Sequence, residues 1–369
     1  MVDNPALFHY EPPGFREVFL LAIIGQLKNK SIKNKGLGEE DAWRLCEEGC
    51  LNPFGLMAAA SEIRDHFQGK AISFCGIVNA KSGKCSEDCA FCAQSGHYKT
   101  KIQAYHLKKA DDIIAAAQQA RTAGAEMFGI VTSGKGIKSK KEWSEIFRAI
   151  EGIRSLGVLP CASLGMISGE RARSLKDAGL FRYHHNLETS RSYFPNICTT
   201  HEYEEDVATV RTAIDAGLSV CSGGLIGLGE GMSHRIELAL TLRELAVDSV
   251  PVNILNPIKG TPLGGRPPLP PLEILLTIAV FRFLLPDRDI RLCGGKEKSL
   301  RQLLPLAVVA GCNALMTGHY LTTPGRDPEL DVEMIRDLGF MPTREPQHVC
   351  KCAADCHLED REIEKDTCS

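Results

Sequence analysis

The chain has 369 residues, of which 44% are hydrophobic and 24% are charged, and its formal net charge at pH 7 is −3. These values are typical of a globular protein, and a charge so close to zero excludes the strongly basic character expected of a protein that binds nucleic acid or an anionic membrane. Fifteen cysteines, an odd number with no secretory signal ahead of them, predict reduced thiols and metal ligation in the cytoplasm and exclude a disulfide framework.

Residues 1–68 predict a helical extension at the start of the chain. One helix is expected to open at Glu39, and residues 56–67 predict another. The most apolar run, residues 18–24, has seven residues, whereas a helix needs about 20 to span a bilayer. We therefore predict a packed helix at this run and a soluble protein.

Three cysteines lie within eight residues after the first predicted strand. Cys85, Cys89 and Cys92 have the spacing C-x3-C-x2-C. Thiolates are the usual ligands of iron–sulfur clusters, and a four-iron cluster takes four ligands, so three local cysteines leave one iron free for another molecule. Zinc fits less well, because a structural zinc site closes a tetrahedral shell of four protein ligands. The alternative is three unrelated reduced thiols on a loop.

From residue 71 onward, short apolar runs alternate with longer amphipathic segments. Near-continuous apolar runs predict parallel strands that are buried on both faces, and eight strand–helix alternations predict an α/β fold, a TIM-type (β/α)8 barrel over residues 69–325. A doubly wound open sheet is the structural alternative. The predicted strands are 71–79, 127–132, 158–163, 181–186, 218–222, 250–255, 289–293 and 313–317. The predicted helices are 107–123, 140–155, 168–178, 203–216, 233–246, 271–285 and 297–310.

Polar residues and glycines end several of these strands, where a barrel core needs only apolar side chains. Asn186 and Glu188 end the fourth strand, Glu230 follows the fifth, and Asn253 lies in the sixth. We interpret Glu230 as a carboxylate that accepts hydrogen bonds from a ribose or an ammonium group. Each of these residues could simply cap a loop, but their matching positions favour a ligand site at the carboxyl end of the barrel, which also holds the cysteine loop.

Residues 326–369 predict a C-terminal extension with a cysteine-rich tail. Cys350, Cys352 and Cys356, with Cys368 behind them, would suffice for a four-ligand iron–sulfur or zinc site. They would equally suit a thiol-rich end that binds no metal. The spacing does not decide between these two interpretations.

The cysteine loop, with Phe91 directly before its last cysteine, resembles the signature of the radical S-adenosylmethionine (radical SAM) superfamily. The resemblance implies that Cys85, Cys89 and Cys92 hold a 4Fe-4S cluster, whose free iron binds SAM, and that Phe91 lies close to the adenine. Reductive cleavage of SAM would then release a 5′-deoxyadenosyl radical.

Further stretches, in order along the chain, resemble the biotin synthase family: residues 185–187, 220–224, 227–230, 250–253 and 260–263. The resemblance implies a homodimeric enzyme that converts dethiobiotin to biotin by inserting sulfur, with one SAM cleaved for each hydrogen removed. It also implies that Asn186 and Asn253 bind the ureido ring of dethiobiotin and that Glu188 binds the ribose of SAM. The partners expected from it are a flavodoxin or ferredoxin as reductant, and proteins of sulfur delivery and cluster assembly.

The same family implies a second cluster deep in the barrel, with two irons held by three cysteines and one arginine. Cys161, Cys221 and Arg291 match three of these ligands, but the fourth position falls at Gly129. Cys293 lies two residues beyond Arg291, and therefore on the same face of its strand. We hypothesise that four cysteines hold a four-iron auxiliary cluster that delivers the sulfur: Cys75, Cys161, Cys221 and Cys293. The alternative is that Cys75 and Cys293 are small core residues.

Two other functions stay open at this point. A hydrogenase-maturation or methylornithine-type radical SAM enzyme would share the barrel and the cysteine loop. A non-catalytic metal-binding module would use its cysteines structurally and would not cleave SAM. The asparagines and the cysteines inside the strands favour biotin synthase. We assign no acid–base catalytic residue, because in radical chemistry of this kind the protein mainly orients the reactants and excludes water.

Overall fold

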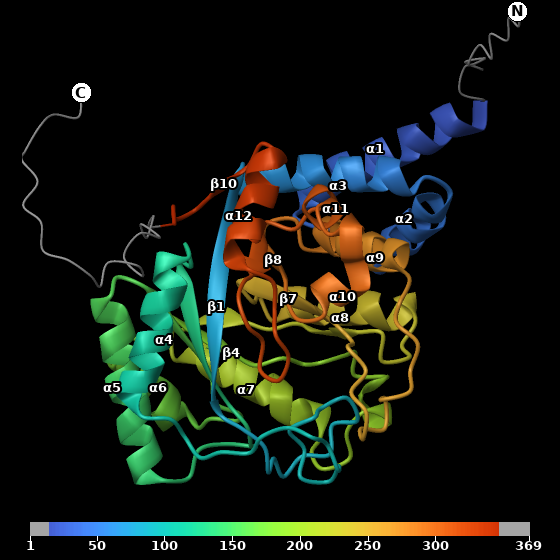
Figure 1. Cartoon of the computed structure of the whole chain (residues 1–369). Coiled ribbons are helices and arrows are strands. Elements are labelled where there is room, and N and C mark those ends of the chain that lie inside the picture. Colours follow the sequence, from blue (N-terminus) through green and yellow to red (C-terminus); the bar gives the residue numbers. More distant parts are fainter. Residues whose placement is uncertain (1–14, 347–369) are drawn as a thin grey trace, which may run out of the picture.

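Strand β1 (Ala71–Lys81) closes the sheet into a barrel, because it pairs in parallel with β2 (Met127–Thr132) on one side and with β9 (Ala314–Met316) on the other. The structure is a computed structural model that describes residues 15–346, and within this range the strands form the predicted closed barrel (Figure 1). The other barrel strands are β3 (Leu159–Ser163), β4 (Arg182–His184), β5 (Ser219–Cys221), β7 (Ser249–Ile254) and β8 (Asp289–Leu292). The closed strand order excludes the open sheet.

Amphipathic helices surround the strands, as their sequence pattern predicts. In α5 (Lys140–Ser155), the side chains of Trp143, Ile146, Ile150 and Ile153 recur at helical spacing and are buried against the sheet. The Ser139 side chain accepts a hydrogen bond from the Glu142 amide and so caps the start of this helix. The other helices between the strands are α4 (Ala110–Thr122), α6 (Gly169–Asp177), α7 (Tyr203–Asp215), α8 (Met232–Glu244) and α9 (Pro271–Leu284).

The helix predicted at residues 297–310 is interrupted. It consists of α10 (Lys296–Leu300), the 3-10 turn η2 (Arg301–Leu303) and α11 (Leu306–Val309). Pro305 lies directly before α11, where a proline cannot continue the preceding turn because it has no backbone N–H. The prediction of a continuous helix was therefore wrong at this point.

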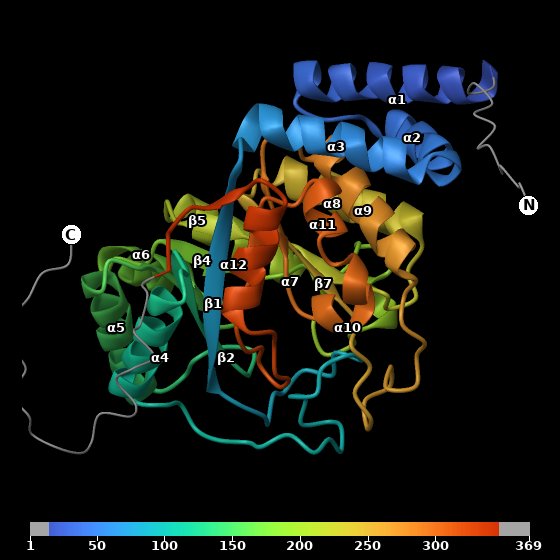
Figure 2. The ribbon, with the colours of Figure 1, turned by 45° about the horizontal axis from the view of Figure 1, so that its top comes forward.

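The N-terminal extension forms three helices, α1 (Phe15–Asn34), α2 (Glu39–Leu51) and α3 (Pro53–Gln68). Figure 2 shows them across the amino-terminal end of β1, opposite the loop that follows β1. Ile23 and Ile24 of α1 are buried, in agreement with the prediction of a packed helix. Among the described residues 15–346, no helix combines the length and the apolar character needed to cross a membrane.

The fifth strand of the barrel is broken after Cys221. It continues as β6 (Gly224–Ile226), a strand that the sequence analysis did not predict, and both pieces pair with β7. A Cβ atom on Gly223 would lie 2.2 Å from the Pro251 carbonyl oxygen, and one on Gly224 would lie 2.5 Å from the Glu188 carbonyl oxygen. Only glycine allows the backbone to approach its neighbours so closely at this break.

Beyond residue 325 the chain adds α12 (Pro328–Asp337) and the short strand β10 (Met341–Pro342), which pairs with the start of β1. The buried Lys296 ammonium lies 2.9 Å from the buried Asp331 carboxylate and joins α10 to α12. The cysteines predicted in the tail, Cys350, Cys352, Cys356 and Cys368, lie outside the described residues.

Candidate active site

The barrel encloses a cavity of about 350 Å3, which is lined by residues of its strands and of the loops at their carboxyl ends. Most of the predicted site residues meet there. Those that line the cavity are Cys75, Phe91, Cys161, Asn186, Glu188, Cys221, Asn253, Arg291 and Cys293. Residues far apart in the sequence are brought together because alternate side chains of every barrel strand point inward.

The same alternation places two further residues in the cavity that the sequence analysis did not identify. Arg182 and His184 precede Asn186 at two-residue intervals and line the cavity with it. Arg182 is buried, and its Nε donates to the Ser219 hydroxyl over 2.9 Å. The two-residue period from Asn186 was the signal that could have identified both of them.

Four cysteines and two arginines belong to this lining, and we call them the cysteine–arginine group: Cys75, Cys161, Arg182, Cys221, Arg291 and Cys293. Cys161 is paired in register with Arg182 across β3 and β4. The Arg291 guanidinium donates to the carbonyl and hydroxyl oxygens of Ser73, at 3.5 and 3.3 Å, and its positive charge acts to lower the pKa of the nearby Cys75 thiol, against the effect of burial. The group therefore contains four thiols within reach of two fixed positive charges.

The electrostatics of this group fit a bound metal cluster. Burial raises the pKa of Cys161 to about 12, and it also raises the pKa values of Cys75, Cys221 and Cys293, while the charges of Arg182 and Arg291 act in the opposite direction. An apolar core gains nothing from four thiols beside two buried guanidinium groups. Thiolates bound to iron, with the arginines as counter-charges, would account for the four thiols and for the two buried guanidinium groups.

Asn186 and Asn253 line the same cavity as the cysteine–arginine group. The Asn186 Oδ1 atom accepts from the Gly223 amide over 3.2 Å, and the Asn253 Oδ1 atom accepts from the Gly294 amide over 3.1 Å. The Asn253 Nδ2 atom also donates to the Gly224 carbonyl over 3.3 Å. These bonds fix both side-chain amides in the cavity wall, and each amide keeps one N–H and one lone pair for a ligand.

Glu188 is the acidic residue of the cavity. Its backbone has a φ of 62°, which is rare for a residue other than glycine, and the Asn186 Nδ2 atom donates to its carboxylate over 3.2 Å. Burial raises the pKa of Glu188 to about 7. Burial also lowers the pKa of the neighbouring His184 to about 4, so His184 is neutral at physiological pH.

The loop that holds the predicted cluster ligands is compact and turned on itself. The Cys92 amide donates to the Cys89 carbonyl over 2.9 Å, and the Gly96 amide donates to the Cys85 carbonyl over 2.7 Å. Burial raises the pKa of Cys92 to about 11, and the nearby Cys85 adds to this effect. Three neighbouring thiols on one tight loop fit one corner of an iron–sulfur cluster, and Phe91 from the same loop lines the cavity.

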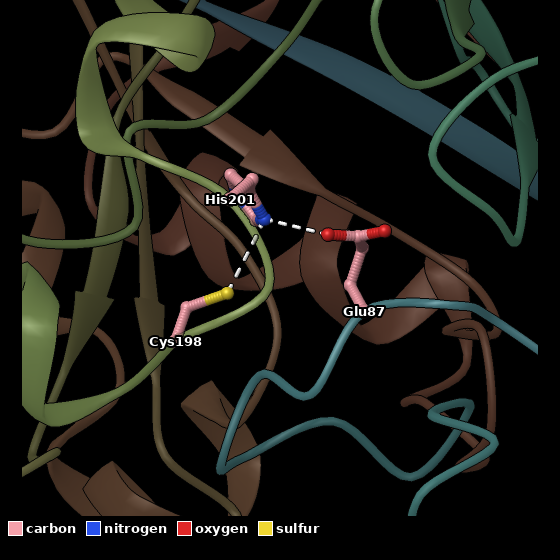
Figure 3. Close-up of side chains that lie close together, drawn as sticks. All are labelled: Glu87, Cys198 and His201. Carbon is pink, nitrogen blue, oxygen red and sulfur yellow. Dashed lines mark hydrogen bonds and ion pairs between the residues drawn. The ribbon is translucent and has the colours of Figure 1, made fainter.

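A second segment, residues 197–201, packs against this loop. It brings Cys198 and His201 beside Glu87, as Figure 3 shows. The His201 Nδ1 atom lies 2.7 Å from Glu87 Oε2 and 3.3 Å from Cys198 Sγ. The sequence analysis did not identify this group, because Glu87 is more than 100 residues away in the chain from Cys198 and His201.

Glu230 is the one predicted ligand-binding residue that the structure does not bring to the cavity. Its carboxylate accepts from the amides of Gly227 and Gly229, at 2.9 and 3.0 Å, and from the Arg235 Nε atom, at 2.7 Å. The side chains of Glu230 and Arg235 are each 2% exposed. The carboxylate is therefore satisfied within its own loop, and Glu230 is not part of the cavity lining.

Two family models match the chain. Residues 80–242 match the model of the radical SAM superfamily, and residues 251–341 match that of the biotin and thiamin synthesis associated domain. The biotin synthase of Geobacter sulfurreducens is 52% identical over 315 residues, which cover 85% of this chain and 96% of that protein. The biotin synthase of Pelotomaculum thermopropionicum is 54% identical over 285 residues, which cover 77% and 88%.

Solved structures of two other proteins share the fold at low identity. The crystal structure of methylornithine synthase superposes with a TM-score of 0.74 at 22% identity, over 86% of this chain and 97% of that one. The [FeFe]-hydrogenase maturase HydG superposes with a TM-score of 0.73 at 16% identity, over 87% and 76%. Identity of about half over nearly the whole length of the curated relatives is much more specific than this shared fold, and on that evidence the chain belongs to the biotin synthase family.

Proposed function

We propose that the barrel cavity is the place where this enzyme inserts sulfur into dethiobiotin. The chain is a radical SAM enzyme of biotin synthesis, as its family membership shows. The observation that supports the residue assignments is the convergence on one cavity of Phe91, Glu188, two asparagines and the cysteine–arginine group. One cavity is thus lined by residues suited to bind SAM, to bind a small polar ring and to hold a sulfur-bearing cluster.

Asn186 and Asn253 bind the ureido ring of dethiobiotin in this proposal. A ureido group presents two N–H donors and one carbonyl acceptor, and a side-chain amide offers the complementary acceptor and donor. Both amides are held by backbone groups of the wall, so they are oriented before the substrate binds. Apolar residues of the same cavity, such as Ile77, Val131 and Leu225, suit the hydrocarbon part of dethiobiotin.

Cys85, Cys89 and Cys92 hold the 4Fe-4S cluster, with Phe91 and Glu188 beside the adenosine of SAM. When bound, the reduced cluster supplies the electron that cleaves SAM, and the 5′-deoxyadenosyl radical that results abstracts hydrogen from the substrate. The ionised Glu188 carboxylate accepts hydrogen bonds from the ribose hydroxyls. The wall residues exclude water and leave one hydrogen of the substrate within reach at a time.

Cys75, Cys161, Cys221 and Cys293 hold the auxiliary cluster, which we propose to be of the four-iron type. All four thiols line the cavity, which supports a set of four cysteines. Arg182 and Arg291 then act as counter-charges to the thiolates. The side chain at the remaining family position is absent, because residue 129 is glycine.

The proposal includes protein partners that the resemblance to the family implies. A flavodoxin or ferredoxin supplies one electron for each SAM, and sulfur and cluster assembly proteins reload the auxiliary cluster after turnover. A homodimer is the proposed assembly. These partners are tested separately from the chemistry, because a chemical reductant and chemical reconstitution replace them in a purified system.

An anaerobic incubation of the reconstituted protein tests the function. The mixture contains SAM, a strong chemical reductant and dethiobiotin, and mass spectrometry measures biotin and 5′-deoxyadenosine. We expect biotin with about two deoxyadenosines for each, since two C–H bonds are broken, and neither product from a Cys89→Ala variant, which lacks a ligand of the SAM-binding cluster. Deoxyadenosine without biotin from a protein with a full auxiliary cluster would contradict the assignment of dethiobiotin as the substrate.

A further inference from the structure

Residues 197–201 fasten the cluster loop to the barrel through a dense set of hydrogen bonds. The Ala90 amide donates to the Ile197 carbonyl over 2.8 Å, and the Thr199 amide donates to the Asp88 carboxylate over 2.8 Å. The Thr200 hydroxyl donates to Glu87 Oε2, also over 2.8 Å. These bonds surround Cys89, the middle ligand of the cluster loop.

His201 extends this attachment to the wall of the cavity. Its Nδ1 atom lies 2.7 Å from Glu87 Oε2, and its Nε2 atom lies 3.2 Å from Asp206 Oδ2. The other Asp206 oxygen, Oδ1, lies 2.8 Å from the Nε2 atom of His185, which directly precedes Asn186. Glu87, His201, Asp206 and His185 therefore form one chain of contacts from the cluster loop to the substrate wall, and the His201 side chain is only 8% exposed.

A metal site is the alternative interpretation of the group formed by Glu87, Cys198 and His201. Ligand atoms of Glu87, Cys198 and His201 all lie within 4.8 Å of one another, and their types suit zinc. However, two ligands about 2 Å from one tetrahedral ion lie more than about 3 Å apart, whereas the Nδ1–Oε2 distance is 2.7 Å. Both ring nitrogens face carboxylate oxygens, so both donate a proton, and no lone pair is left on the ring for a metal. The geometry is that of hydrogen bonds.

We propose that His201 is a positioning residue, which through Glu87 and Asp206 holds the SAM-binding cluster loop at a fixed distance from the substrate wall. The inference rests on the proposed function of the cavity. A displacement of about 1 Å between reacting groups can cost about a hundredfold in rate. Loss of the His201 contacts should therefore leave SAM cleavage possible while fewer radicals reach the substrate. The products measure this directly, as biotin formed per 5′-deoxyadenosine.

Three substitutions at one position separate the two contacts of the ring. Asparagine places its amide nitrogen near the position of Nδ1 and keeps the donor to Glu87, whereas glutamine places its nitrogen near Nε2 and keeps the donor to Asp206. His201→Ala removes both donors. His66→Ala, at an exposed position of α3, is the matched control. All variants are reconstituted anaerobically, and their iron content is compared with that of the wild type.

We expect biotin per deoxyadenosine to fall by about tenfold to a hundredfold in His201→Ala, and less in His201→Asn and His201→Gln. We also expect a changed electron paramagnetic resonance spectrum of the reduced cluster with SAM bound, and full iron content in the asparagine variant. His66→Ala should match the wild type in each measurement.

The proposal would be overturned if His201→Ala, at full iron content, had the same ratio of biotin to deoxyadenosine and the same electron paramagnetic resonance spectrum as the wild type. Loss of iron from all three His201 variants would also overturn it, because the residue would then serve cluster assembly only. If the wild type bound zinc and His201→Ala did not, the metal site would be established and the proposed positioning role would be replaced by it. The spectrum and the affinity for SAM need no dethiobiotin, so a wrong substrate assignment would not be mistaken for failure of this inference.

Discussion

Ile77 takes up the space beside Gly129: a Cβ atom on residue 129 would lie 3.1 Å from Ile77 Cγ2, across the pairing of β1 with β2. The pattern of the family places a cluster ligand at residue 129, and a side chain there would press against the Ile77 methyl group. The cavity instead receives thiols from Cys75 on β1 and from Cys293 at the end of β8. These two thiols come from β1, which neighbours β2, and from the end of β8, which does not.

Removal of these two thiols should remove the auxiliary cluster. We expect the Cys75→Ala/Cys293→Ala double variant to lose about four of about eight irons per chain, because each four-iron cluster needs its thiolate ligands. Iron and sulfide analysis after anaerobic reconstitution measures this. Cys312→Ala is the control, since Cys312 is also buried but does not line the cavity. Unchanged iron in the double variant would show that Cys75 and Cys293 are core residues.

Truncation of Asn253 should weaken the binding of dethiobiotin. Asn253→Ala removes a donor and an acceptor from the cavity, and a net loss of about 1.4 kcal/mol corresponds to about a tenfold rise in KM for dethiobiotin. Steady-state kinetics at saturating SAM measure it. Asn256→Ala is a suitable control, because the Asn256 side chain accepts from Lys298 and does not line the cavity. Equal KM values for the two variants would contradict the assignment of Asn253 to the ureido ring.

The binding of SAM should depend on pH through Glu188. Burial raises the pKa of this carboxyl to about 7, and the ionised form is the stronger hydrogen-bond acceptor for the ribose. As the pH falls below 7, the ionised fraction falls, so KM for SAM should rise by up to about tenfold per pH unit. Above about pH 8 it should be constant. Glu188→Gln cannot ionise and should show a high KM for SAM without this dependence, and an unchanged pH profile in that variant would exclude Glu188 as the cause.

Glu230 should matter for stability and not for the affinity for SAM. Glu230→Ala leaves the buried Arg235 guanidinium without one of its carboxylates, which costs about 3 kcal/mol in the free energy of unfolding. Glu273 pairs with the same arginine over 2.8 Å but is 42% exposed, so Glu273→Ala should cost less than about 1 kcal/mol. Anaerobic urea unfolding compares the two variants. A raised KM for SAM in Glu230→Ala at unchanged stability would restore the ligand role that the sequence suggested.

Local patterns predicted the elements of this chain well, and most of the predicted site residues line one cavity. The bounds of β2 and α5 agree with their predictions, because an apolar run and an amphipathic period are properties of adjacent residues. Cys161, Asn186 and Asn253, which the sequence analysis predicted as site residues, all line the cavity. The contacts of Glu230 were not predicted: its carboxylate accepts from the amides of Gly227 and Gly229 within its own loop.

The contacts that depend on tertiary structure could not be predicted. Glu87 and His201 meet only because the barrel brings the loops after β1 and β4 together, and neither segment shows this by itself. Arg182 was overlooked for a related reason: a buried arginine is unusual in a strand, and only the closed barrel shows that thiols and Asp289 surround it.

The break between β5 and β6 makes the wall of the cavity depend on Asn186 and Asn253, the two side chains that we propose to bind the substrate. At the break, the Gly223 amide donates to the Asn186 side chain, and the Gly224 carbonyl accepts from Asn253. A substitution of either asparagine therefore removes a substrate contact and a support of the barrel together. During evolution, a new substrate preference would be easier to reach through the apolar lining, at Ile77 or Leu225, than through the two asparagines. The two asparagines proposed to recognise the polar ring are therefore difficult to replace, because the wall of the barrel also depends on them.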